Sequence, residues 1–113
     1  MHRFIVLYQA PLQAAERFAQ ASPEEAQQGV QAWVDWAGKI GTALVDPGSP
    51  LGNARRITRS RVSETRSTII GMSILQAETM DDALDMVKDH HHLQWAEGCE
   101  ILLLEEMPIP ELQ

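Results

Sequence analysis

The sequence predicts one α+β domain, because segments with helical periodicity alternate with runs of β-branched and aromatic residues. The chain has 113 residues, which is the length of a single domain. Its apolar content of 44% and charged content of 22% are those of an ordinary globular protein. We assign residues 1–107 to the domain and residues 108–113, which begin at a proline, to a C-terminal tail.

The strands are predicted from short apolar runs between turn-forming residues. Residues 3–9 form the first strand and residues 100–105 the last, and both are apolar on two faces. Residues 42–45, 55–61 and 68–77 also read as strands, whereas the Pro/Gly-rich segment 46–53 reads as a loop.

Two helices are predicted from their capping residues and apolar stripes. The first begins at Ser22-Pro23-Glu24-Glu25 and ends at Gly41, and the second begins after Thr79. The expected buried stripe of the first helix is Ala26, Val30, Trp33, Val34, Ala37 and Ile40, and that of the second is Ala83, Leu84 and Val87. Residues 11–21 are expected to be a loop with a helical turn.

The predicted order of elements is β-α-β-β-α-β, without exact bounds for the strands. This order is typical of a ferredoxin-like domain, in which two helices cover one face of the sheet. The first and last strands are apolar on both faces, so the uncovered face would be a large apolar patch. We therefore expect a homodimer packed sheet to sheet, as in a dimeric α+β barrel.

Charge and composition exclude several classes of partner. The net charge of −7 would repel a phosphate backbone, so no nucleic acid is expected. No segment has the apolar length to span a membrane. The single cysteine, Cys99, cannot form an internal disulfide, which favours a cytoplasmic location. The glycines lack a phosphate-binding motif, and we expect no cofactor.

The chain resembles the YCII-related family, in the branch whose members often carry a DGPF motif. The resemblance covers most of the chain through an ordered set of short motifs. These are Ser22-Pro23-Glu24-Glu25, Trp33-Val34-Asp35-Trp36, residues 41–48, Pro50-Leu51-Gly52, residues 71–74, Asp82-Ala83-Leu84, His92-Leu93-Gln94-Trp95, residues 98–101 and Met107-Pro108. It implies a ferredoxin-like dimeric barrel.

The chain departs from that family in two respects. The DGPF motif is missing, and by spacing it would fall at residues 59–62. Some family members are proposed to pair a histidine on the first helix with an aspartate. Here the first helix has no histidine, although Asp46 stands near the place of the aspartate.

The histidines at 90–92 are the main candidates for chemistry. Helical phase directs His90 and His91 toward the sheet, and histidine titrates near neutral pH. His90 and His92, with Asp46 as a carboxylate partner, could move a proton. Alternatively, the histidines only cap a helix end, and Asp46 only starts a turn. Their spacing fits no zinc module, and we expect no metal.

Ligand contacts are expected from aromatic and arginine side chains. Trp36 and Trp95 could line or stack on a ligand, or simply pack. Arg59 belongs to a cluster with Arg55, Arg56, Arg61 and Arg66, which could recognise an anion or protect an edge strand by charge.

Three functions remain open from the sequence. The first is a homodimeric domain that binds a small organic molecule, with anions among the candidates, between helices and sheet. The second is a cofactor-independent acid–base enzyme such as an isomerase, lyase or dehalogenase. The third is a non-catalytic accessory or partner-binding dimer.

Overall fold

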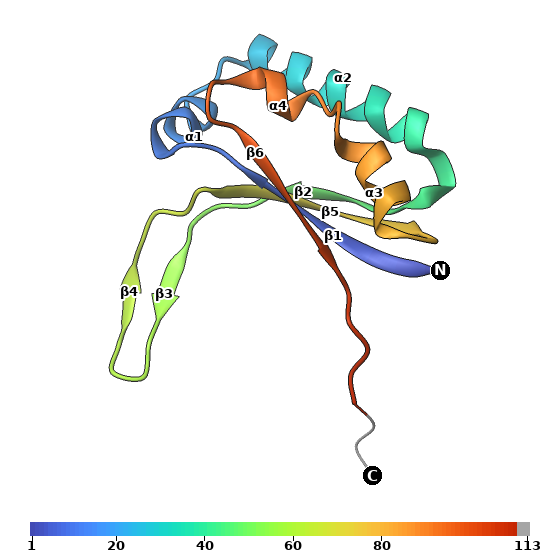
Figure 1. Cartoon of the computed structure of the whole chain (residues 1–113). Coiled ribbons are helices and arrows are strands. Elements are labelled where there is room, and N and C mark those ends of the chain that lie inside the picture. Colours follow the sequence, from blue (N-terminus) through green and yellow to red (C-terminus); the bar gives the residue numbers. More distant parts are fainter. Residues whose placement is uncertain (111–113) are drawn as a thin grey trace.

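The computed structural model describes residues 1–110, without the side chains at positions 18 and 19, and is built on a four-stranded antiparallel sheet. Its strands are β1 (His2–Gln9), β2 (Leu44–Pro50), β5 (Ile69–Ala77) and β6 (Glu100–Glu105), in the spatial order β2-β5-β1-β6 (Figure 1). The first and last strands are therefore neighbours, as Val6 opposite Leu103 shows. Of the predicted tail, residues 111–113 lie outside the described residues.

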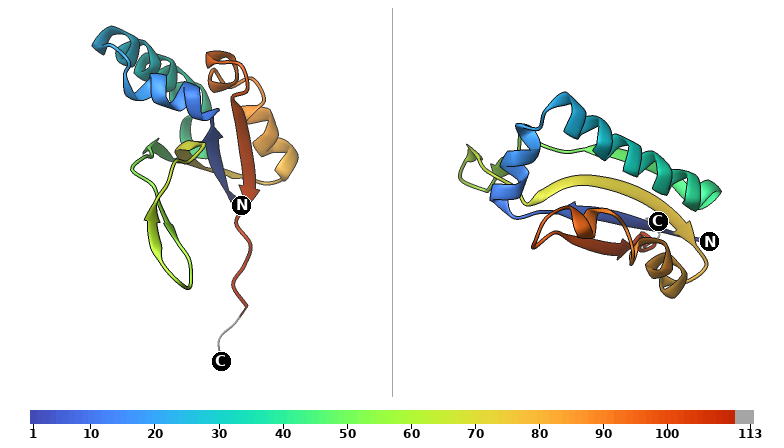
Figure 2. Two further views of the ribbon diagram at one scale, coloured as in Figure 1. Left: turned by 90° about the vertical axis from the view of Figure 1, so that its left-hand side faces the viewer. Right: turned by 90° about the horizontal axis from the view of Figure 1, so that it is seen from above.

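The helices gather on one face of this sheet (Figure 2). They are α1 (Leu12–Ala19), α2 (Pro23–Ile40), the short 3₁₀ turn Gly41–Ala43, α3 (Met80–Val87) and α4 (His92–Trp95). The predicted caps are confirmed: the Ser22 hydroxyl accepts the Glu25 N–H at 3.2 Å, and the Thr79 hydroxyl accepts the Asp82 N–H at 3.1 Å. The segment predicted as a loop with one helical turn is instead the two-turn helix α1.

The core lies between the helices and the sheet. On β1, Phe4, Val6 and Tyr8 are fully or almost fully buried, and they pack with Leu75 of β5. Trp36 of α2 and, from α3, Ala83 and Val87 close the core from above. The expected α3 stripe is correct at these two α3 positions, but Leu84 is 44% exposed.

The predicted apolar stripe of α2 is correct only in part, at Trp33 and Ile40, which pack against the core. Val30 and Val34 are 61% and 55% exposed, whereas Trp36 is only 7% exposed. The first half of the helix, through Gln31, has no side chain packed in the core. Only its second half covers the sheet, and there the tryptophans, which have the most apolar area to bury, take the inner positions.

Two strand predictions also need correction. The segment 46–50, predicted as a loop, belongs to β2, whose pairing with β5 is irregular. Pro47 and Pro50 are tolerated there because β2 is an edge strand. The predicted strand 55–61 is not part of the sheet: β3 (Arg55–Ile57) and β4 (Val62–Glu64) form a separate hairpin.

The second face of the sheet carries no helix. Strand alternation places Ile5 and Leu7 there, opposite Ile74 and Met72 on one side and Leu104 and Leu102 on the other. Leu102 and Leu104 are each 44% exposed. The hairpin β3–β4 and the C-terminal segment extend from the sheet on this side (Figure 1). We call this surface the open face.

Candidate functional site

His90 lies immediately beyond α3, where the chain turns toward α4. Its N–H donates to the Val87 carbonyl at 3.0 Å, and His92 then begins α4. His90 is 1% exposed and His92 is 6% exposed. The prediction that His90 faces the sheet is therefore confirmed, and it is not a solvent-facing helix cap.

Hydrogen bonds fix the protons on these two rings. The backbone N–H of His92 donates to Nδ1 of His90 at 3.0 Å, so Nδ1 is the unprotonated nitrogen and the proton lies on Nε2. Nε2 of His92 lies 2.8 Å from the Gln9 carbonyl, which can only accept, so Nε2 of His92 is the donor.

Aromatic rings surround the His90 imidazole. Ring centroids lie 4.5 Å away for Trp36, 5.0 Å for Tyr8, 5.2 Å for Trp33 and 4.1 Å for His91. The rings come from β1, α2 and the connection between α3 and α4. We call His90 with these four rings the imidazole box.

The Nε2–H donor of His90 is buried and has no hydrogen-bond partner in the described part of the chain. Burial, followed by the neighbouring His91 and His92, lowers the pKa of His90 to about 3. Burial also lowers the pKa of His91. At neutral pH the box therefore presents a neutral imidazole with one free N–H, which can donate a hydrogen bond but does not take up a proton.

A directed chain of hydrogen bonds runs beside the box. The Ser73 hydroxyl donates to the Pro47 carbonyl at 2.8 Å, so the Tyr8 hydroxyl, 3.0 Å from Ser73, must donate to it. Trp33 also donates to the Pro47 carbonyl, at 3.1 Å. Burial raises the pKa of Tyr8 to about 12.

The sequence reasoning missed Tyr8 and Ser73 as parts of this site. The sequence did contain a signal for Ser73. It is a polar residue at an inward-facing position of β5, and a buried polar group needs a hydrogen-bond partner.

Of the other predicted site residues, Trp36 belongs to the imidazole box and Trp95 contacts His92, whereas Arg59 lies far from both histidines. Trp36 lies in the core, where its Nε1–H donates to the Met86 carbonyl at 3.0 Å. Trp95 is 44% exposed and stacks on His92 with centroids 6.4 Å apart. Arg59 lies in the turn between β3 and β4, on the opposite side of the sheet from the helices (Figure 1).

Asp46 has a turn-forming role. Its carboxylate accepts the Gly48 N–H at 2.8 Å, which stabilises the bend that presents the Pro47 carbonyl to Ser73 and Trp33. All ion pairs among residues 1–110 use arginine or lysine, and none joins a histidine to a carboxylate.

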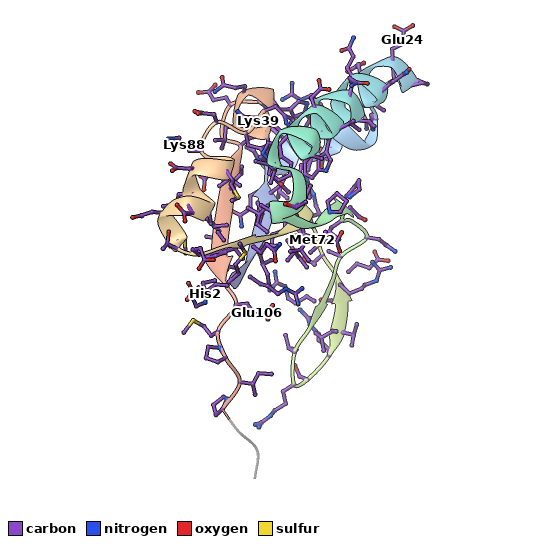
Figure 3. The ribbon with its side chains drawn as sticks, turned by 90° about the vertical axis from the view of Figure 1, so that its right-hand side faces the viewer. His2, Glu24, Lys39, Met72, Lys88 and Glu106 are labelled. Atoms are coloured by element: carbon purple, nitrogen blue, oxygen red, sulfur yellow. The ribbon has the colours of Figure 1, made fainter. Side chains whose placement is uncertain are left out.

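The fourth histidine, His2, lies at the end of β1 that adjoins the C-terminal segment, near Glu106 (Figure 3). In the described part of the chain, no group of three or more His, Cys, Asp or Glu residues is arranged to hold a metal ion. No helix within residues 1–110 has both the length and the apolar character to cross a membrane.

Comparison with known proteins adds no relative: no family model matches the chain, and no curated protein matches it at a significant level. The resemblance to the YCII-related family stays a prediction from the motifs.

Proposed function

We propose that the chain is a small-molecule-binding domain whose ligand accepts a hydrogen bond from Nε2–H of His90. The observation that carries this proposal is the unpartnered buried donor inside the imidazole box. Leaving a buried donor unsatisfied costs about 1–3 kcal/mol, and native proteins do so rarely. A ligand oxygen at Nε2 would recover that free energy.

The surroundings of Nε2 define the chemical class of the ligand. The box offers one neutral donor among aromatic rings, which suits a flat organic molecule with a carbonyl or carboxyl oxygen. Trp33 and His91 are its partly exposed members. A ligand would therefore enter where α2 meets the α3–α4 connection, by displacing His91 from its ring contact with Trp33 at 5.6 Å.

The acid–base enzyme is the less favoured alternative. A general base works best when its pKa is near the working pH, whereas the pKa of His90 is about 3. Nδ1 of His90 and Nε2 of His92 are both engaged with the backbone. Asp46, the predicted carboxylate partner, is engaged with Gly48. Binding, with polarisation of a carbonyl, uses the buried Nε2–H of His90, which no backbone group engages.

We also propose that the domain has the ferredoxin-like topology and works as a homodimer through its open face, in agreement with the YCII-related resemblance. The order β2-β5-β1-β6 supports this proposal, because the first and third strands of the sheet along the chain, β1 and β5, lie in its centre. The apolar ladder of Ile5, Leu7, Met72, Ile74, Leu102 and Leu104 is the surface that a second sheet would cover. A free, buried Cys99 is compatible with a cytoplasmic location.

The large solvent-exposed area of the chain supports the proposed dimer. The chain exposes 8359 Å², whereas a compact monomer of 12.6 kDa exposes about 6,200 Å². Its radius of gyration is 15.8 Å, against about 13 Å for a compact domain of this length. The excess of about 2,000 Å² per chain exceeds the roughly 800 Å² that each partner buries in a standard interface.

Ligand binding is tested by histidine ring NMR and thermal shift with a panel of aromatic carboxylic acids and ketones. We expect at least one compound to raise the melting temperature and to shift the Nε2–H resonance of His90. The variant His90→Phe should lose both responses, while His2→Phe, which changes an exposed histidine, should keep them. If no compound moves the Nε2–H resonance, or if His90→Phe still responds, the binding proposal is wrong.

The dimer is tested by sedimentation at micromolar concentration. We expect the wild type to sediment as a dimer and Leu7→Glu, which places a charge on the open face, to sediment as a monomer. The matched control is Val34→Glu on α2, which is already 55% exposed on the other side of the molecule. A monomeric wild type would refute the dimer without affecting the binding site.

A further inference from the structure

The hairpin β3–β4, with the turn that joins its strands, forms a narrow arm over residues 55–64. Ile57 pairs directly with Val62, and these side chains are 76% and 66% exposed. The turn is held by the Thr58 N–H, which donates to the Arg61 carbonyl at 2.8 Å. The arm leaves the sheet between β2 and β5 and extends away from the helices, on the side of the open face (Figures 1 and 2).

An arm of this kind needs a covering surface. A two-stranded hairpin is marginally stable in water by itself. Here its only apolar pair lies open to solvent, and the ion pair between Arg55 and Glu64 is long, at 4.0 Å, and exposed. Burying Ile57 and Val62 against a surface outside this chain would therefore be favourable in free energy.

The charge of the arm identifies the surface that suits it. Residues 55–64 carry four arginines and one glutamate, a net charge of +3, whereas the rest of the chain carries −10. Arg59 and Arg61 lie at the tip, where they would be first to meet another molecule. The body of a second copy is strongly acidic and so attracts the arm electrostatically.

We propose that this arm docks on the flank of the second copy in the dimer, with Ile57 and Val62 buried against it and Arg59 and Arg61 facing its carboxylates. This inference rests on the proposed open-face dimer, in which stacked sheets lie about 10 Å apart. The arm extends on the side that the partner occupies, so each copy would clasp the other. Arg59 then serves assembly rather than ligand recognition.

Two measurements test the arm directly. The first is amide hydrogen exchange of residues 55–64 in the wild type and in the Leu7→Glu monomer. We expect exchange to be at least tenfold slower in the wild-type dimer. The second is the dissociation constant of Ile57→Ser/Val62→Ser, which should rise at least tenfold. The control Val30→Ser/Val34→Ser removes two apolar side chains from α2 that are 61% and 55% exposed, and it should leave the dimer unchanged.

The contribution of the arm's arginines to dimer affinity is measured separately, from its dependence on salt. Raising the salt concentration should weaken the wild-type dimer, and Arg59→Gln/Arg61→Gln should flatten that salt dependence, because exposed ionic contacts are screened.

The outcomes separate failure of the arm from failure of the dimer. A wild-type dimer whose arm exchanges as fast as in the monomer, and whose affinity is the same after Ile57→Ser/Val62→Ser, would overturn the arm and leave the dimer standing. A monomeric wild type would overturn both. Protection of the arm that appears only on adding anionic vesicles or duplex DNA would assign it to a different partner and also overturn the inference.

Discussion

The backbone N–H of His92 donates to the ring nitrogen Nδ1 of His90 across 3.0 Å. This bond between residues two apart in the sequence decides the chemistry of the cluster. It engages the nitrogen that would otherwise accept a proton, and it leaves the free N–H on the buried side of the ring. Three consecutive histidines thus become a hydrogen-bond donor site rather than a proton acceptor.

The first prediction is that His90 makes the fold sensitive to acid. Its pKa is about 3 in the folded chain and about 6.5 in the unfolded chain, so only the unfolded chain gains a proton between these values. The stabilisation is complete above about pH 6.5 and is lost as the pH falls toward 3. Between pH 7.5 and 5, His90 should account for a loss of about 2 kcal/mol in the free energy of unfolding.

Urea denaturation at these two pH values measures this loss. His90→Phe should show a smaller loss than the wild type, and His2→Phe should behave as the wild type. Ring NMR of the native protein gives a check that needs no variant, since the His90 resonances should not titrate between pH 5 and 8. Titration of His90 in that range would contradict the assignment.

The element types were predictable from the sequence, but their packing was less so. The caps at Ser22 and Thr79 and the alternation in β1 are local, and the structure confirms them. The buried side of α2 is not local: it depends on which half of the helix lies over the sheet, and so Val34 rather than Trp36 became exposed. The segment 55–64 has strand-forming residues, but nothing in its sequence indicates that its two halves pair with each other and not with the main sheet.

The candidate site was predictable only in part for the same reason. Helical phase located His90, because α3 and the sheet are adjacent in the chain and in space. Tyr8 and Ser73 are 65 residues apart, and their hydrogen bond exists only because β1 and β5 are neighbours. The role of Asp46 could be foreseen as a turn, but not that this turn positions the Pro47 carbonyl.

The second prediction concerns the hydrogen-bond chain from Tyr8 through Ser73 to Pro47. Ser73→Ala removes both the donor to the Pro47 carbonyl and the acceptor for the Tyr8 hydroxyl, at a completely buried position. We expect a loss of about 1–3 kcal/mol, and a loss of about 1 kcal/mol for Tyr8→Phe, which leaves Ser73 bonded to Pro47. Denaturant unfolding of both variants and the double variant gives the coupling free energy.

The coupling free energy between Tyr8 and Ser73 decides whether the two hydroxyls act together. After Ser73→Ala, the Tyr8 hydroxyl has lost its acceptor, so removing it should cost less than in the wild type. Strictly additive losses would show that the two hydroxyls do not act as one chain.

The third prediction is that Tyr8 ionises only when the fold opens. It is the single tyrosine of the chain, so phenolate absorbance near 295 nm reports on it alone. Burial raises the pKa of Tyr8 to about 12. We expect no phenolate in the native protein at pH 10.5 and a substantial fraction in urea-unfolded protein at the same pH. Equal absorbance in the two states would contradict the burial of this ring.

The fourth prediction concerns Gly48, the residue that lets β2 bend between Asp46 and Ser49. Its φ is +87°, and a Cβ built on it would collide with the backbone carbonyl of Met72 in β5. Both features exclude other residues, because side chains rarely adopt this conformation and the backbone of a paired strand cannot move aside. Gly48→Ala should therefore lower the free energy of unfolding by roughly 3 kcal/mol or more.

Gly52→Ala is the matched control, because Gly52 lies in the same connection, a Cβ there has open space, and its φ is not in the left-handed region. We expect its effect to stay within about 0.5 kcal/mol. Gly48→Ala should also displace the Pro47 carbonyl and so reduce the coupling between Tyr8 and Ser73, since Ser73 donates to that carbonyl. If Gly48→Ala were as stable as the control, β2 could not follow this path along β5, and the hydrogen-bond chain at the imidazole box would lose its acceptor.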